Sequence, residues 1–224
     1  VTSVQLILKD VHSDALQQEE EAKTKIYDHR RKTNILAQVN DYIKTSKLSI
    51  SAFVEDRAIL EGLKPFKEIF EHIVNRNSVQ KSDVLMFFDY PADEEVMQNI
   101  MTAVAPDTIH YMKYQAEKYN EELMLKTFSG MIRYTCNTLG GDFNLTRAAS
   151  ALGVNNPVIE TMLEMFEDTG MIKIKERGEN AFKIEFLQVV ELSKTLHTMK
   201  YAEFVELMNT INDYKNKFMS IDIN

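Results

Sequence analysis

The feature that most constrains the fold is an alternation, between residues 26 and 125, of short apolar runs and segments with helical periodicity. The runs at 48–54, 84–88 and 108–112 are rich in β-branched and aromatic residues, which is typical of buried strands. The segments between them carry apolar residues at helical spacing: Ile35, Leu36, Val39 and Ile43; Phe66, Ile69, Phe70 and Ile73; Val96, Ile100, Met101 and Val104. This alternation predicts a small parallel sheet with helices on its faces, a Rossmann-like α/β domain over 26–125.

A different pattern over residues 126–188 predicts a winged helix. One helical face ends at Gly140-Gly141, Asn144 can cap a second short helix, and Asn156-Pro157 starts a third. Alternating runs at 171–175 and 181–186 flank an Arg-Gly-Glu-Asn turn and predict a β-hairpin. Three helices followed by a hairpin is the order of a winged helix-turn-helix domain. Residues 189–224 are expected to form C-terminal amphipathic helices, with this apolar set: Leu192, Leu196, Met199, Phe204, Leu207, Met208 and Ile211.

Residues 1–25 differ from the rest and are expected to be the end of a preceding domain followed by a linker. Val4 to Leu8 is strand-like but has no hairpin partner nearby, and Gln17 to Glu21 is a solvated charge run. The first residue is Val1 and not Met. We therefore expect the chain to be a piece of a longer protein.

The acidic composition limits how the chain can meet nucleic acid. A formal net charge of −8 and a pI near 5.2 oppose a surface that binds phosphates all over. The single cysteine, Cys136, forms neither an internal disulfide nor a Cys-x-x-Cys site, which favours a reducing compartment. Without a signal peptide or an apolar run of about 20 residues, we expect a cytoplasmic protein with no membrane partner.

Catalytic and metal-binding patterns are weak. The five histidines are scattered, and none of them pairs with another at the spacing of three or four residues that places two ligands on one side of a helix. Asp28-His29-Arg30 is similar to the Asp-His-His triplet of a phosphoesterase family, but the further aspartate motifs that hold two metals are absent. Cys136 lies among apolar neighbours and is interpreted as a buried thiol. No catalytic, cofactor-binding or metal-binding residue is predicted.

Asp89 is the one residue of the α/β domain for which two interpretations stay open. It follows the strand at 84–88, where ligands bind in open α/β sheets, so it can be a ligand group. The same carboxylate can instead have a structural role, which the lack of a Gly-rich phosphate loop in this region favours.

Two charged clusters of the predicted winged helix are candidate interaction sites. Four cations in and around the hairpin form a candidate nucleic-acid site: Lys173, Lys175, Arg177 and Lys183. Four acids of the third helix form a candidate protein-docking site: Glu160, Glu164, Glu167 and Asp168. Because that helix has no Lys or Arg between 157 and 170, phosphate repulsion should keep it out of a DNA groove. The hairpin cations can also be a solvated set that protects the sheet edge.

The chain as a whole resembles the C-terminal region of the RecJ exonucleases of Firmicutes. The segments that carry the resemblance are Val4–Asp10, Ile26–Arg30, Val84–Pro91, Ile109–Met112 and the stretch from Phe128 to Ile172, taken in their order and spacing. None of the family's catalytic core is covered.

The resemblance implies an accessory region of a 5′-to-3′ exonuclease specific for single-stranded DNA, acting in repair and recombination. Mn or Mg would serve the absent catalytic core, and none is expected here. The implied partners are the rest of the parent nuclease chain, a single-strand-binding protein or a helicase, and single-stranded DNA through the parent. The alternative is a winged-helix DNA-binding module or transcription regulator that uses the basic hairpin.

Overall fold

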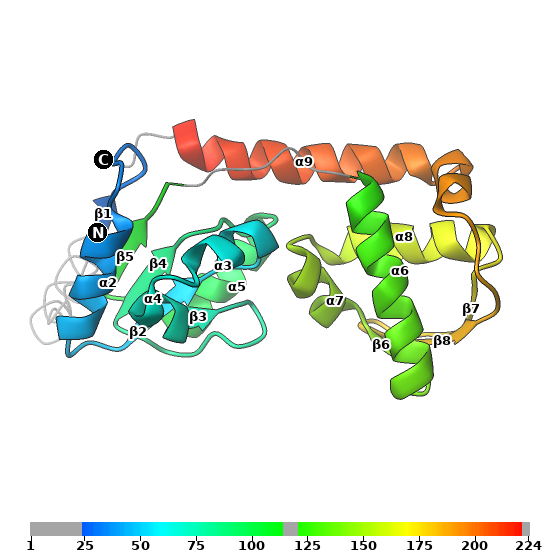
Figure 1. Ribbon diagram of the computed structural model, residues 1–224, viewed down its shortest axis with the longest axis horizontal. Coiled ribbons are helices and arrows are strands. Elements are labelled where there is room, and N and C mark those ends of the chain that lie inside the picture. The colour runs from blue at the N-terminus through cyan, green and yellow to red at the C-terminus, as the bar shows by residue number, and fades with distance from the viewer. Residues whose placement is uncertain (1–23, 114–120, 221–224) are drawn as a thin grey trace, which may run out of the picture.

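The computed structural model describes residues 24–113 and 121–220, with side chains of the last helix up to Phe218. It has two units, one around a parallel sheet and one around a small antiparallel sheet, and a long C-terminal helix runs along both (Figure 1). The expected closing strand at 4–8 and most of the expected linker lie outside the described residues. Lys25, at the end of that linker, instead opens the first strand.

The first unit is built on a five-stranded parallel sheet with the strand order β1-β5-β4-β2-β3. Its strands are β1 (Lys25–Asp28), β2 (Ile50–Phe53), β3 (Ile73–Val74), β4 (Val84–Phe87) and β5 (Thr108–Tyr111). Strands β2 and β4 are buried along their whole length. The predicted parallel α/β sheet is therefore confirmed.

Helices cover both faces of this sheet. They are α2 (Leu36–Thr45), α3 (Arg57–Leu63), α4 (Lys67–Glu71) and α5 (Glu94–Val104). Because strand side chains alternate between faces, Ala52 and Met86 pack with α2, α3 and α4, whereas Phe53 and Phe87 pack with α5 on the other face.

Two strands and one helix of the first unit were not predicted. β1 is an edge strand whose four residues are all exposed, so it lacks the apolar run that marks β2 and β4, and β3 has only two residues. Ile73, expected on a helix, belongs to β3, because the helix ends at Glu71 with His72 as its C-cap. Asp56 caps α3, where its side chain accepts bonds from the amides of Ala58 and Ile59.

The second unit contains three helices and a three-stranded antiparallel sheet of order β6-β8-β7. In chain order the elements are α6 (Glu121–Thr138), β6 (Asp142–Asn144), α7 (Leu145–Leu152), α8 (Asn156–Asp168), β7 (Ile172–Arg177) and β8 (Ala181–Phe186). The predicted hairpin is confirmed as β7 and β8. Asn144 caps α7 as expected, and the cap of α8 is Asn155.

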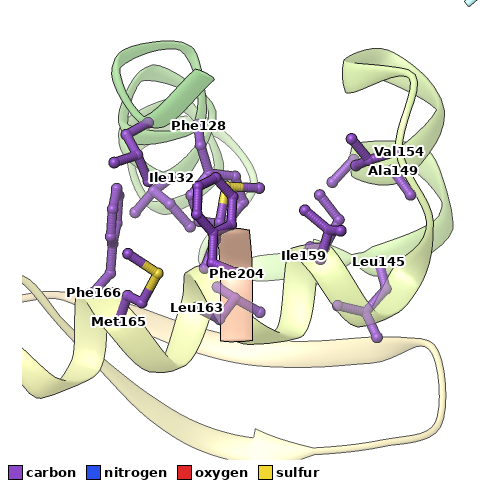
Figure 2. Packing of buried hydrophobic residues seen from close by; sticks show 14 of the residues in the cluster. Phe128, Ile132, Leu145, Ala149, Val154, Ile159, Leu163, Met165, Phe166 and Phe204 are labelled. Carbon is purple, nitrogen blue, oxygen red and sulfur yellow. The ribbon is translucent and has the colours of Figure 1, made fainter. Parts of the chain in front are cut away.

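The C-terminal stretch is not one continuous helix. A 3₁₀ helix, η1 (Leu192–His197), precedes α9 (Tyr201–Ser220). Met199, predicted to be part of the apolar set, lies between them and is 96% exposed. Phe204 of α9, predicted in the same set, is buried together with Phe128, Leu163 and Phe166 in the core of the second unit (Figure 2).

Candidate functional site

The carboxyl edge of the parallel sheet, where its strands end, is the place at which such folds usually bind ligands. Strand β2 leads to β3 on one side of the sheet, whereas β4 leads to β5 on the other. After the neighbouring strands β2 and β4, the chain therefore continues in opposite directions along the sheet. Such a place is called a topological switch point, and the crevice there is the usual ligand site. Asp89 follows β4 at this point, so its contacts decide between its two interpretations.

The Asp89 carboxylate is completely buried and accepts four hydrogen bonds. One oxygen accepts from the amides of Glu55 and Asp56, at 3.1 and 2.8 Å, and so ties the end of β2 to the end of β4. The other accepts from the amide of Tyr90 at 2.7 Å and from the ammonium of Lys215 at 3.0 Å. These bonds occupy the side chain's acceptor positions.

Lys215 comes from α9, far away in the sequence, and its side chain is only 6% exposed. Three residues later in the same helix, the ring of Phe218 stacks on Tyr90 with 5.2 Å between centroids. The guanidinium of Arg30, which follows β1, donates to the carbonyl of Phe218. The last turns of α9 therefore fill the space above the ends of β1 and β4.

A second buried ion pair closes the end of β2. The guanidinium of Arg76 and the carboxylate of Glu55 pair with side chains that are 8% and 2% exposed. The hydroxyl of Ser150, from α7 of the second unit, donates to the same carboxylate at 2.8 Å. Nearby, the Asn155 amide donates to Asp93 at 2.9 Å. The second unit thus sits on the carboxyl edge through α7, the start of α8 and the end of α9.

The space around Asp89 itself is therefore filled by the chain's own groups, and Asp89 links three segments. Two hollows remain at this edge, one of about 440 Å³ beside Arg76 and Asp93 and one of about 480 Å³ beside Phe88 and Met112. Sequence reasoning missed Lys215 and Glu55 as its neighbours. A signal for Lys215 was present, because Phe204, Met208, Ile211, Lys215 and Phe218 follow one another at spacings of four and three residues. A lysine in the middle of such an apolar stripe indicates a buried, paired cation.

The two charged clusters of the second unit lie side by side and pair with each other. Arg177 bonds to both Glu164 and Glu167 of α8, at 3.2 and 3.3 Å. Lys175 pairs with Glu185 across the hairpin, and Lys183 pairs with Asp142 of β6. Three of the four candidate DNA-binding cations thus face carboxylates, while Lys173 is exposed on β7.

The acids of α8 fall into two groups. Glu164 bonds to Arg177 and to Lys200, and Glu167 also accepts from the amide of Ile174 at 2.7 Å. Burial alone would raise the pKa of Glu164, but the bonds from Lys200 and Arg177 outweigh it and lower the pKa. Glu160 and Asp168 are exposed. The candidate docking face is therefore divided into a bonded part and a solvated part.

The Asp28-His29-Arg30 triplet is brought to the same edge of the sheet, where Asp28 and Arg30 bond to each other and His29 faces β5. Arg30 holds the Asp28 carboxylate with two bonds and lowers the pKa of Asp28 to about 2. The His29 Nε2 atom lies 3.0 Å from Nδ1 of His110 on β5. Burial lowers the pKa of His110 to about 4, with a further contribution from His29.

Other chemistry is sparse within the described residues. Residues 24–113 and 121–220 contain no group of three or more His, Cys, Asp and Glu side chains arranged to hold a metal ion. Burial raises the pKa of the Cys136 thiol, which makes it less reactive. None of the helices within those ranges is both long and apolar enough to cross a membrane.

Comparison with known proteins identifies no relative: no family model, no curated protein and no solved structure matches the chain.

Proposed function

We propose that this chain is a non-catalytic accessory region of a larger nuclease of the RecJ type. The observation that supports this most directly is the bonding of Asp89, the carboxylate at the switch point, to three backbone amides and to Lys215, which leaves it no acceptor position for a ligand. An α/β domain whose sheet edge is bonded to its own C-terminal helix is suited to fixing the position of attached parts. Its partners would be the nuclease core and a single-strand-binding protein or a helicase.

The second unit is proposed to be a winged helix. Its chain order of helix, strand, two helices and hairpin, with β6 next to β8, is the arrangement that this motif requires. In a DNA-binding winged helix the third helix lies in the major groove. Here α8 is the third helix and packs against α9, and Thr161, Leu163 and Met165 are buried. This packing favours a docking role over the alternative role as a DNA-binding module or transcription regulator.

The proposal is tested on two levels. The purified chain, supplied with Mn²⁺ and labelled single-stranded DNA, is expected to leave the DNA intact; degradation that co-purifies with the chain through a second column would contradict it. The reading frame upstream of Val1 is expected to encode a core with Asp-His-His motifs. A gene without such a core would refute the parentage.

A further inference from the structure

One segment of the first unit carries a net positive charge, although the chain as a whole is acidic. Residues 24–49, which contain β1 and α2, carry six Lys and Arg against two Asp, a net charge of +4. Because the whole chain carries −8, the remainder carries −12. This segment lies at the end of the molecule opposite the β7–β8 hairpin (Figure 1). It is the kind of local basic surface that an acidic protein needs to contact phosphates.

Aromatic rings lie on the same surface. Lys25 and Tyr27 of β1, and His29 directly after it, alternate along the chain and lie on the face of the sheet that α2 covers. Tyr27 stacks on His110 with 4.9 Å between centroids, and Tyr42 of α2 lies 5.9 Å from the same ring. Tyr27 is 48% and Tyr42 39% exposed. Both tyrosine rings thus lie against His110, Tyr27 stacked and Tyr42 tilted, and both side chains are partly exposed to solvent.

The cations here differ from those of the hairpin in their pairing. Lys25, Lys32 and Lys44 are exposed, and within the described residues they form no ion pair. In the hairpin, by contrast, Arg177 and Lys183 are neutralised by carboxylates. Asp41 is the only acid of α2, and Asp28 is bonded to Arg30. The β1–α2 surface therefore keeps its positive charge, whereas the hairpin does not.

A hollow of about 200 Å³ lies beside the rings and is lined by Lys32, Gln38, Tyr42 and both histidines. The contact between His29 and His110 uses one nitrogen of each ring, and the other two, Nδ1 of His29 and Nε2 of His110, are buried without a partner. Whichever ring donates the hydrogen bond between them, one of the two remaining nitrogens is a donor and the other an acceptor. Unsatisfied buried groups are rare and often mark functional sites.

We propose that these residues form a binding site for single-stranded nucleic acid, the basic aromatic surface, consisting of Lys25, Tyr27, His29, Lys32, Tyr42 and His110. Lysines contact phosphates, and the tyrosine rings stack on bases, a combination typical of sites that bind single strands without sequence preference. The hollow accepts a base edge next to the histidines. Duplex bases are stacked inside and cannot use the rings, so a single strand is the favoured ligand.

This inference goes beyond the accessory role and does not depend on the proposed parentage. The chain can bind a single strand whether or not its gene encodes a nuclease core, and it can belong to a nuclease without binding DNA itself. Binding experiments on the chain and the nuclease assay therefore fail independently.

The test measures fluorescence anisotropy of a labelled dT20 oligonucleotide with the full 224-residue chain at 50 mM salt. We expect salt-dependent binding that Tyr27→Ala weakens by about fivefold or more, the usual contribution of one stacked base. Tyr27→Phe, which keeps the ring, should bind like the parent chain. Lys25→Glu with Lys32→Glu should reduce the slope of log affinity against log salt by about 1.4, as expected for two lost phosphate contacts.

Control variants at other sites test whether binding takes place at the basic aromatic surface. Tyr134, on α6, is 59% exposed, so Tyr134→Ala removes an equally accessible ring from another site and should leave binding unchanged. Lys175→Glu with Arg177→Glu should also leave it unchanged. Absence of dT20 binding at 50 mM salt would overturn the proposal. So would binding that the hairpin variant abolishes and Tyr27→Ala does not affect, provided that the variants unfold at the same temperature as the parent chain.

Two further probes define the ligand. rU20 distinguishes RNA from DNA: tighter binding of rU20 would make RNA the ligand of this surface, and tighter binding of dT20 would make it DNA. A 20-base-pair duplex should bind more weakly than dT20. Equal affinity for the duplex, insensitive to Tyr27→Ala, would exclude stacking and overturn the inference.

Discussion

The ammonium of Lys215 lies 3.0 Å from the carboxylate of Asp89, although the two residues are 126 positions apart in the sequence. Both side chains are buried, at 6% and 0% exposure. Removing one partner leaves a buried charge without its counterion, which typically costs about 3–5 kcal/mol. The pair therefore joins the C-terminal helix to the sheet.

A double-mutant cycle on this pair should separate the contributions of Asp89 and Lys215 to the free energy of unfolding. Asp89→Ala is expected to be the more damaging change, because it also strips the amides of Glu55, Asp56 and Tyr90 of their acceptor. Lys215→Met should cost less, since those amides still stabilise the carboxylate. The free energies of unfolding of the single variants and of the double variant, from urea titration, should show strong coupling; additive effects would contradict the buried pair.

The stability of the chain should fall as the pH is lowered from about 6.5 to 4. Burial depresses the pKa of His110 from 6.5 to about 4, so in this window the unfolded chain binds a proton that the folded chain does not, and unfolding becomes more favourable. The loss is on the order of 2 kcal/mol when solvent screening of the partly exposed ring is allowed for.

His110→Phe provides the check, because it removes the group with the larger shift and keeps a ring beside Tyr27; His29, whose pKa burial also lowers, remains in this variant. Urea midpoints are measured between pH 2 and 7, and above pH 4 they should depend less on pH in this variant. A second decline, below pH 3.8, belongs to Asp28, whose pKa is lowered to about 2 by its bonds to Arg30, and this decline should persist.

Two acids of α8 should differ in their contribution to stability. Glu167→Ala removes the acceptor of the Ile174 amide and one partner of Arg177, and a cost of about 1–2 kcal/mol is expected. Glu160 is exposed on the same helix, so Glu160→Ala should stay within about 0.5 kcal/mol of the parent chain. Thermal unfolding of the two variants measures the difference in their stability. Equal melting temperatures would contradict the bonding described for Glu167.

Two glycines should respond in opposite ways to alanine. Gly141 has φ +89°, and a Cβ there would lie 2.2 Å from the carbonyl oxygen of Ile184 on β8, so Gly141→Ala should destabilise the second unit strongly. Gly130 lies within α6 with nothing near its missing side chain, and Gly130→Ala should stabilise by about 1 kcal/mol. Circular dichroism melts of both variants test the two signs.

The sequence was sufficient to predict elements whose signal is local. Buried runs such as Val84–Phe87 and the Arg-Gly-Glu-Asn turn define the parallel sheet and the hairpin without reference to the rest of the chain. Short edge strands such as Ile73–Val74 lack enough residues for a period, and the preceding apolar spacing extends a helix into them. Met199 fits a helical stripe by spacing, but the break between η1 and α9 exposes it.

The pairing of charges could not be predicted in the same way. Glu167 belongs to the acidic cluster of α8 and Arg177 to the basic cluster of the hairpin. Only the packing of β7 against α8 brings the two residues together. The basic aromatic surface was missed for a similar reason, because His110 reaches Tyr27 through the pairing of β5 with β1. Contacts between distant segments depend on topology, which a single sequence specifies only indirectly.

The distance in sequence between Asp89 and Lys215 also governs the order of events at the ribosome. A chain made at roughly 5–20 residues per second exposes Asp89 for roughly 6 to 25 s before the 126th following residue, Lys215, has been added. During translation the first unit thus carries an unneutralised carboxylate at its sheet edge, and its final locking coincides with completion of α9. A truncated translation product would carry the same defect permanently, and this would make it a ready substrate for cellular proteases.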